Sequence, residues 1–115
     1  MTWNLFLDDE RFPPNDGRDW VIARTAKEAM RHCINQGTPS YISFDHDLGA
    51  DEWTGHDFAK WLVENDLNFS TFPKIQFPTN FAFYVHSQNP IGKANIEGLL
   101  NNYLKVKNEH SFILF

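Results

Sequence analysis

The chain has 115 residues, a formal net charge of −5 and a hydrophobic content of 42%, which predict one folded domain over residues 1–115 and exclude a disordered chain. No cluster of Lys and Arg marks a duplex DNA surface, and no stretch is long and apolar enough for a membrane span. The lone Cys33 and an N-terminus unlike a signal peptide predict a core thiol in a cytoplasmic protein.

The first predicted elements are two strands joined by a short link. Residues 3–8 form an apolar strand that runs into the acidic pair Asp8-Asp9, and residues 19–24 form the second. The turn-rich segment 12–17 between them contains two prolines and an Asp-Gly step. A parallel crossover usually needs a dozen or more residues, so the second strand is either an edge strand reached by an extended loop or antiparallel.

A helix follows the second strand and has clear start and stop signals. Thr25 is the predicted N-cap, with Glu28 completing a capping box, and Gly37 ends the helix. Its predicted inner face consists of Ala26, Ala29, Met30, Cys33 and Ile34.

The middle of the chain predicts a central strand over 41–46 and a second helix. Thr54 caps this helix, which runs through about Glu64. Its predicted inward residues are Phe58, Ala59, Leu62 and Val63. Residues 66–80 are harder to interpret, because the prolines that bracket 74–77 allow either a short edge strand or a loop.

The last part predicts a strand over 81–86, a third helix after Gly92 and an apolar tail over 111–115. We expect the tail to pair as a final strand, or alternatively to form a homodimer contact. The alternation of strands and helices predicts an α/β fold with a mostly parallel sheet of four to five strands, covered on both faces.

Acidic residues follow two of these strands. Asp8, Asp9, Asp45 and Asp47 offer the hard oxygen ligands that Mg²⁺, Mn²⁺ or Ca²⁺ prefer. Because the carboxyl ends of parallel strands share one edge of the sheet, a shared cation site is expected there. The alternative is that the acidic pairs are solvated turns.

Two histidines also stand at strand ends. His46 and His86 each end an apolar run, where a polar ring needs a partner. Together beside the carboxylates they predict a general acid and a general base. Alternatively, each is a core-edge histidine that backbone carbonyls satisfy.

Other polar residues near these ends suit a phosphate-bearing ligand. Ser87, Asn89 and Asn95 offer neutral hydrogen-bonding groups at the start of the third helix. Arg11 and Lys93 are the best-placed cations for a phosphoryl group. With Asp47, they are the predicted substrate-binding residues.

The layout resembles a response-regulator receiver domain, a three-layer, flavodoxin-like fold. The acidic pair after the first strand, Asp45 after the central strand and Ser87 after the next match the receiver pattern. The sequence departs from it because Arg11-Phe12-Pro13-Pro14 replaces the first helix and no lysine follows a fifth strand.

A narrower group, the cyclic-phosphate-processing receiver-like family of bacteria and phages, is more similar. Three motifs carry this resemblance: Leu7-Asp8-Asp9-x-Arg11-x-Pro13, Phe44-Asp45-His46-Asp47-Leu48-Gly49 and His86-Ser87-x-Asn89-Pro90-x-Gly92-x-x-Asn95-Ile96. The resemblance implies Mg²⁺ or Mn²⁺ on Asp8, Asp9 and Asp45. It also implies that His46 and His86 act as the acid–base pair, and that Ser87 and Asn89 orient phosphate.

Three functions are compatible with these motifs. The first is a metal-dependent phosphoesterase acting on a small cyclic nucleotide or a 2′,3′-cyclic phosphate at an RNA end, in which Asp45 also takes part in catalysis. The alternative is a catalytically inactive module that binds a nucleotide or a protein partner. The third is a phosphorylation switch on Asp45, which the missing lysine disfavours.

Overall fold

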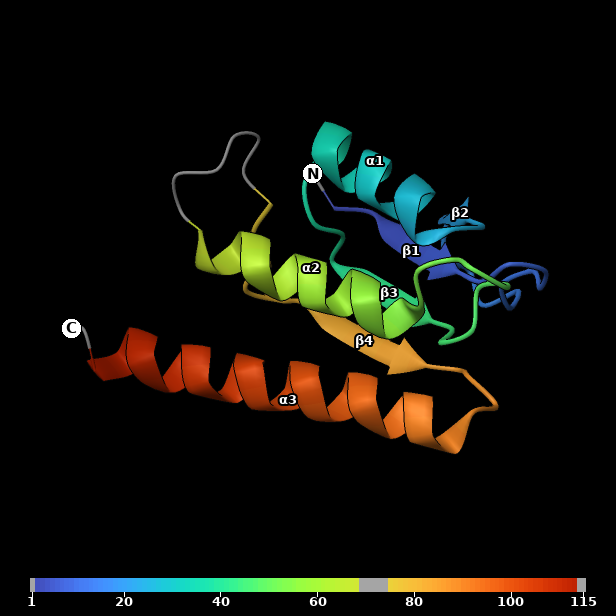
Figure 1. The fold of residues 1–115 in the computed structure, drawn as a ribbon. Coiled ribbons are helices and arrows are strands. Elements are labelled where there is room, and N and C mark those ends of the chain that lie inside the picture. Colours follow the sequence, from blue (N-terminus) through green and yellow to red (C-terminus); the bar gives the residue numbers. More distant parts are fainter. Residues whose placement is uncertain (1, 69–74, 114–115) are drawn as a thin grey trace.

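A computed structural model describes residues 2–68 and 75–113, with side chains described as far as residue 108. The elements follow one another along the chain as shown in Figure 1. They are β1 (Asn4–Leu7), β2 (Trp20–Ala23), α1 (Ala26–Gln36), β3 (Tyr41–Phe44), α2 (Gly55–Leu67), β4 (Ala82–Val85) and α3 (Pro90–Ile113). The four strands that the sequence indicates in this part of the chain are therefore confirmed, each two residues shorter than predicted.

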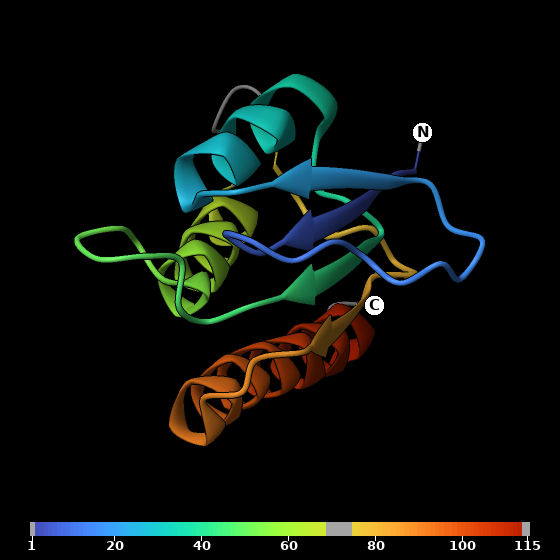
Figure 2. The ribbon, with the colours of Figure 1, turned by 90° about the vertical axis from the view of Figure 1, so that its right-hand side faces the viewer.

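The four strands form one all-parallel sheet in the order β2-β1-β3-β4. This order answers the question that the short link left open, because β2 is a parallel strand at the edge. The connection between β1 and β2 returns across the sheet on the side away from α1 and α2, where Figure 2 shows it in front of the strands. Pro13 and Pro14 lie in this connection and disfavour a helix interior there.

The three helices share one hydrophobic core with one face of the sheet. The strand residues in this core alternate along the chain, so they all point to the same face. The buried core residues of the strands and helices include Leu5, Leu7, Ile42, Phe44, Val85, Ala29, Cys33, Phe58, Leu62, Ile96 and Leu100. The predicted α/β fold with a mostly parallel sheet is therefore confirmed. In the described residues the helices lie against one face of the sheet, and the extended β1–β2 connection lies against part of the other face.

Helix starts follow the predicted capping signals. The side chain of Thr25 accepts a hydrogen bond from the N–H of Glu28, so Thr25 is the N-cap of α1. The predicted capping box is not completed there, because the carboxylate of Glu28 accepts from the N–H of Arg24 (2.9 Å) and not from that of Thr25. Thr54 forms a capping box with Asp57. Cys33 is fully buried as predicted. Ile34 was expected on the inner face of α1 but is 44% exposed, because it lies beside the buried stripe and not within it.

The end of α3 differs from the predicted final strand. The helix continues to Ile113, so the strand predicted over 111–115 is wrong for residues 111–113, and residues 114–115 lie outside the described part. No Gly or Pro, the residues that most strongly end a helix, follows Gly98 in the sequence. The dimer contact predicted for the tail concerns side chains outside the described ones. None of the described helices has the length and hydropathy of a membrane span.

The segment that was hard to interpret is partly helical. Helix α2 extends to Leu67, past the expected Glu64, and residues 69–74 lie outside the described part. Residues 75–78 are irregular, which corresponds to the loop alternative, and Ile75 and Phe77 are buried in the core.

Candidate active site

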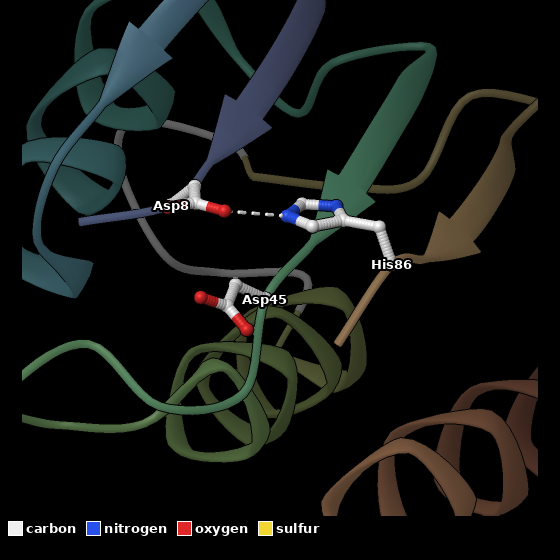
Figure 3. Close-up of side chains that lie close together, drawn as sticks. All are labelled: Asp8, Asp45 and His86. Carbon is white, nitrogen blue, oxygen red and sulfur yellow. Dashed lines mark hydrogen bonds and ion pairs between the residues drawn. The ribbon is translucent and has the colours of Figure 1, made fainter. Parts of the chain in front are cut away.

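The carboxyl ends of β1, β3 and β4 bring Asp8, Asp45 and His86 together. Their backbone N–H groups continue the parallel ladder, with hydrogen bonds of 3.1, 2.9 and 2.9 Å to the neighbouring strands. The three side chains each place one potential ligand atom within 4.8 Å of the others (Figure 3). We call these residues the strand-end cluster.

Asp8 is fully buried, and both of its carboxylate oxygens have partners. Oδ1 accepts hydrogen bonds from the backbone N–H groups of Glu10 (2.9 Å) and Arg11 (2.8 Å), and Oδ2 lies 2.9 Å from Nε2 of His86. Burial by itself would raise the pKa of Asp8, but these hydrogen bonds outweigh it and lower the pKa. The carboxylate is therefore held in its ionised form.

His86 is fixed by contacts on several sides. Its Nδ1 lies 2.7 Å from Oγ of Ser43, and its Nε2 faces Asp8. The ring stacks on Phe6, with 4.8 Å between ring centroids and an interplanar angle of 3°. Sequence reasoning missed Ser43, although a hydroxyl inside a strand, two residues before Asp45 and on the same face, was a usable signal.

Asp45 has the opposite electrostatic setting from Asp8. Burial and the nearby charge of Asp8 raise its pKa, and this rise is only partly offset by the N–H of His46, His86 and Arg11. The His46 N–H donates to Oδ1 of Asp45 over 2.8 Å. Two carboxylates at close range repel each other, so a cation placed between them would lower the free energy of the folded state.

His46 points to a different place from His86. Its ring lies so close to Gly92, in the first turn of α3, that a Cβ atom there would come within 2.3 Å of the ring. Its Nδ1 lies 2.9 Å from Oδ1 of Asp47. The structure does not bring the two predicted acid–base histidines into one cluster, and a role of His46 in proton transfer stays a prediction.

Asn89 joins the loop after β3 to the start of α3. Its Oδ1 accepts a hydrogen bond from the N–H of Gly92 (3.0 Å), as an N-cap does, and its Nδ2 donates to Asp47 over 3.4 Å. The N–H of Asn89 in turn donates to Oγ of Ser87 over 3.1 Å. The polar groups expected to orient phosphate therefore also stabilise this turn.

A cleft of about 510 Å³ opens beside the strand-end cluster, and we call it the strand-end cleft. It is lined by Asp9, Glu10, Arg11, Asp45, Asp47, Gly49, Ser87, Gln88 and Asn89. Most of the predicted metal and substrate residues thus share one cavity. Lys93 and Asn95 are not among its lining residues: the Lys93 amine lies 5.9 Å above the ring of Tyr84, and Asn95 is exposed on α3.

Two further residues shape the site without having been predicted. A Cβ on Gly55 would come within 1.9 Å of the carbonyl oxygen of Asp45, so only glycine lets α2 begin this close to the end of β3. The guanidinium of Arg24 donates to the carbonyl oxygen of Asp8 (3.1 Å) and holds the start of the β1–β2 connection.

The strand-end cluster has the chemistry of a divalent cation site. Its two carboxylates supply hard oxygen atoms, and its imidazole supplies a nitrogen that Mn²⁺ accepts more readily than Mg²⁺. Asp9 was also predicted as a ligand, but it is exposed and lies on the cleft wall outside the compact group.

One protein family matches the chain. The model of a family described as the cyclic-phosphate processing receiver domain matches residues 3–102, which include all four strands and every predicted site residue. No curated protein and no solved structure matches the chain.

Proposed function

Because the chain belongs to the cyclic-phosphate processing receiver family, we propose that it is a metal-dependent phosphoesterase that hydrolyses a cyclic phosphate. The proposed substrate is a small cyclic nucleotide or the 2′,3′-cyclic phosphate of an RNA end. The observation that carries the proposal is the strand-end cluster, in which two carboxylates and one imidazole lie within 4.8 Å beside a cleft.

In this proposal Asp8 and Asp45 hold Mg²⁺ or Mn²⁺, with Asp9 available from the cleft wall. A divalent cation supplies charge neutralisation at a phosphoryl group and lowers the pKa of bound water. Burial and the close approach of the two carboxylates raise the pKa of Asp45, and the repulsion between the carboxylates supports this assignment because it favours binding of a positive charge.

His86 moves the proton of the reaction. Hydrolysis forms one bond from a water oxygen to phosphorus, breaks one bond from phosphorus to a ribose oxygen, and leaves the proton on that ribose oxygen. Nε2 of His86 faces the carboxylates, and Ser43 holds Nδ1 on the other side, so Nε2 is the atom proposed to carry the proton.

Arg11 is the cation proposed to bind the phosphate. Its side chain is 42% exposed at the cleft, and its Nε lies 4.0 Å from Oδ2 of Asp8. Ser87 and Asn89 offer hydrogen bonds on the same cleft. His46, which contacts Asp47 and Gly92 and is not among the residues that line the cleft, is proposed to position this wall.

The test is incubation of the protein with Mg²⁺ or Mn²⁺ and a panel of 2′,3′-cyclic and 3′,5′-cyclic nucleotides, with chromatography of the products. We expect a linear monophosphate from at least one member of the panel.

His86→Ala should lower kcat by about 10²–10⁴-fold, the typical contribution of a general acid or base, while Mn²⁺ binding persists. Loss of Mn²⁺ binding in this variant would make His86 a ligand instead. His46→Ala should cause a smaller loss than His86→Ala.

Two other outcomes would replace the proposal. Nucleotide that binds and remains intact after long incubation would identify a binding module without chemistry. A covalent phosphoryl adduct on Asp45 after treatment with a small phosphodonor such as acetyl phosphate would identify a phosphorylation switch.

A further inference from the structure

The sheet face opposite the helices carries aromatic side chains in place of a helical layer. Phe6, Trp20, Tyr41 and Tyr84 alternate with the core residues of their strands, so they point to this face. They line a pocket of about 300 Å³, which we call the sheet-face pocket. Tyr84 is 54% exposed, and Trp20 and Tyr41 are partly exposed.

This pocket is continuous with the strand-end cluster. Phe6, Ser43 and Tyr84 are register partners across the sheet, and each stands two residues before a member of the cluster. Because side chains two apart on a strand share a face, the cluster forms the next row of the same surface. His86, which stacks on Phe6, belongs to the cluster and also lines the pocket.

Cations border the aromatic surface. Arg11 lines both the strand-end cleft and the sheet-face pocket, so it stands where the two meet. The guanidinium of Arg18 lies 4.3 Å from the centroid of the Tyr41 ring, and the Lys93 amine lies 5.9 Å from that of Tyr84. Arg18 is paired with Asp16, which also lines the pocket, so Arg11, where the two cavities meet, is the cation that fits an anionic group beside a flat, polarisable ring.

We propose that the sheet-face pocket binds the nucleobase of the substrate, so that the enzyme acts on cyclic phosphates of nucleosides rather than on the bare cyclic phosphate group. The position of the phosphate in this inference rests on the proposed function. The position of the base does not, because it is argued from the aromatic surface. The phosphate lies at Arg11 and the strand-end cluster, and the base stacks on the aromatic surface one sugar away. A pocket volume of roughly 300 Å³ is at the lower end of the usual range for small ligands, which favours a single base over a protein segment.

The first test is binding, because it does not depend on turnover. The indole N–H resonance of Trp20 is assigned by its loss in Trp20→Phe and is then followed by NMR. The protein is titrated with adenosine 2′,3′-cyclic phosphate, once in the presence of EDTA and once in the presence of Mg²⁺. We expect this resonance to shift, and the same titration with glycerol 1,2-cyclic phosphate, which has no base, to leave it in place. No shift under either condition overturns the inference.

The second test uses Tyr84, which is exposed enough to be replaced without loss of fold. Tyr84→Ala should bind adenosine 2′,3′-cyclic phosphate roughly 5- to 150-fold more weakly, the loss expected for one stacked base, and Tyr84→Phe should restore the affinity. Val106→Ala, an exposed apolar truncation far along α3, is the control. Equal affinity of parent and Tyr84→Ala contradicts the inference.

Turnover separates this inference from the proposed function. For each protein, the kcat/KM for adenosine 2′,3′-cyclic phosphate is divided by the kcat/KM for glycerol 1,2-cyclic phosphate. If this ratio is the same in the parent and in Tyr84→Ala, the base site is refuted and the proposed phosphoesterase activity stands. If the indole N–H resonance of Trp20 shifts but no cyclic nucleotide is hydrolysed, the base site is supported and the phosphoesterase activity is refuted. Binding of a second copy of the chain at this face, detected as a dimer whose formation Tyr84→Ala prevents, also overturns the inference.

Discussion

Two aspartates at neighbouring strand ends have opposite effects on the fold, although both belong to the strand-end cluster. Asp8 is buried with hydrogen bonds from two backbone N–H groups and a 2.9 Å contact to His86, which lower its pKa. Asp45 lies in the field of Asp8, and burial together with that charge raises its pKa. The first carboxylate organises the site, and the second is held at an energetic cost that a bound cation would relieve.

This contrast predicts stability changes of opposite sign at neutral pH. Without divalent metal, Asp45→Asn should unfold at a higher urea concentration than the parent, because it removes charge repulsion and keeps an acceptor for the His46 N–H. Asp8→Asn should cost about 1.5–3 kcal/mol, since it weakens charge-assisted hydrogen bonds in a buried place. Equilibrium unfolding in EDTA measures both. A less stable Asp45→Asn would show that Asp45 is not strained by its neighbour.

The buried thiol of Cys33 gives a prediction about alkaline pH. Burial raises its pKa from 9.0 to about 12, so the folded chain keeps the proton after the unfolded chain has lost it. The resulting contribution to stability is present below pH 9 and is lost as the pH rises from 9 towards 12, by up to about 1.4 kcal/mol per pH unit. Unfolding curves of the parent and Cys33→Ala at several pH values isolate this slope. Identical slopes above pH 9, or rapid labelling of the native thiol at pH 8, would contradict it.

At the scale of elements, the site depends on close contacts of helix starts with the ends of strands. The start of α2 approaches the backbone of Asp45 at Gly55, and the start of α3 approaches the ring of His46 at Gly92. The neighbour at Gly55 is a backbone carbonyl, which cannot move aside without moving β3. The neighbour at Gly92 is a side chain, which can rotate.

Glycine substitutions should therefore differ by position. Gly55→Ala should destabilise the fold by roughly 1–3 kcal/mol or more, because a Cβ would meet the Asp45 carbonyl oxygen at 1.9 Å. Gly98→Ala is the matched control, since nothing lies within 4 Å of its Cβ and alanine is the better helix former. It should stabilise α3 by about 0.5–1 kcal/mol. The midpoints of thermal or urea unfolding measure both, and a neutral Gly55→Ala would mean that α2 does not begin this close to β3.

At the scale of the whole molecule, helices α2 and α3 and the loop before β4 are tied together by a buried carboxylate. Asp66 in α2 accepts a hydrogen bond from the N–H of Phe77 (2.8 Å) and a charged one from Lys107 of α3 (2.9 Å). The hydroxyl of Tyr103, also in α3, donates to its other oxygen, and burial with this contact raises the pKa of Tyr103. Asp66 is thus a second buried acid whose role is to hold α3 against α2, far from the chemistry.

Removal of this carboxylate should loosen α3 while the strand ends stay formed. Asp66→Ala should lower the free energy of unfolding by about 3 kcal/mol, because it leaves a buried backbone N–H and a tyrosine hydroxyl without their acceptor. Lys105→Ala, on an exposed position of α3, should change it by less than about 0.5 kcal/mol. Urea unfolding measures both variants. Equal stabilities of the two variants would show that the Asp66 contacts do not anchor the helix.

The local signals in the sequence determined the parts of this fold that depend on neighbouring residues. Thr25 and Thr54 cap their helices as predicted, because the capping bonds span only three residues. The meeting of Asp8 with Asp45 and His86 also followed from the sequence, since parallel strands align their carboxyl ends. The helical tail was not predicted, because an apolar run suits a strand or a helix equally well.

Only the tertiary structure decided which partners the site residues have. The sequence treats His46 and His86 alike, yet one ring lies against Gly92 while the other lies between Asp8 and Ser43. The sequence likewise predicts a sheet covered on both faces, whereas the β1–β2 connection leaves an aromatic pocket beside the site. Side-chain direction and the packing of distant elements depend on contacts between residues far apart in the chain, and no local pattern records them.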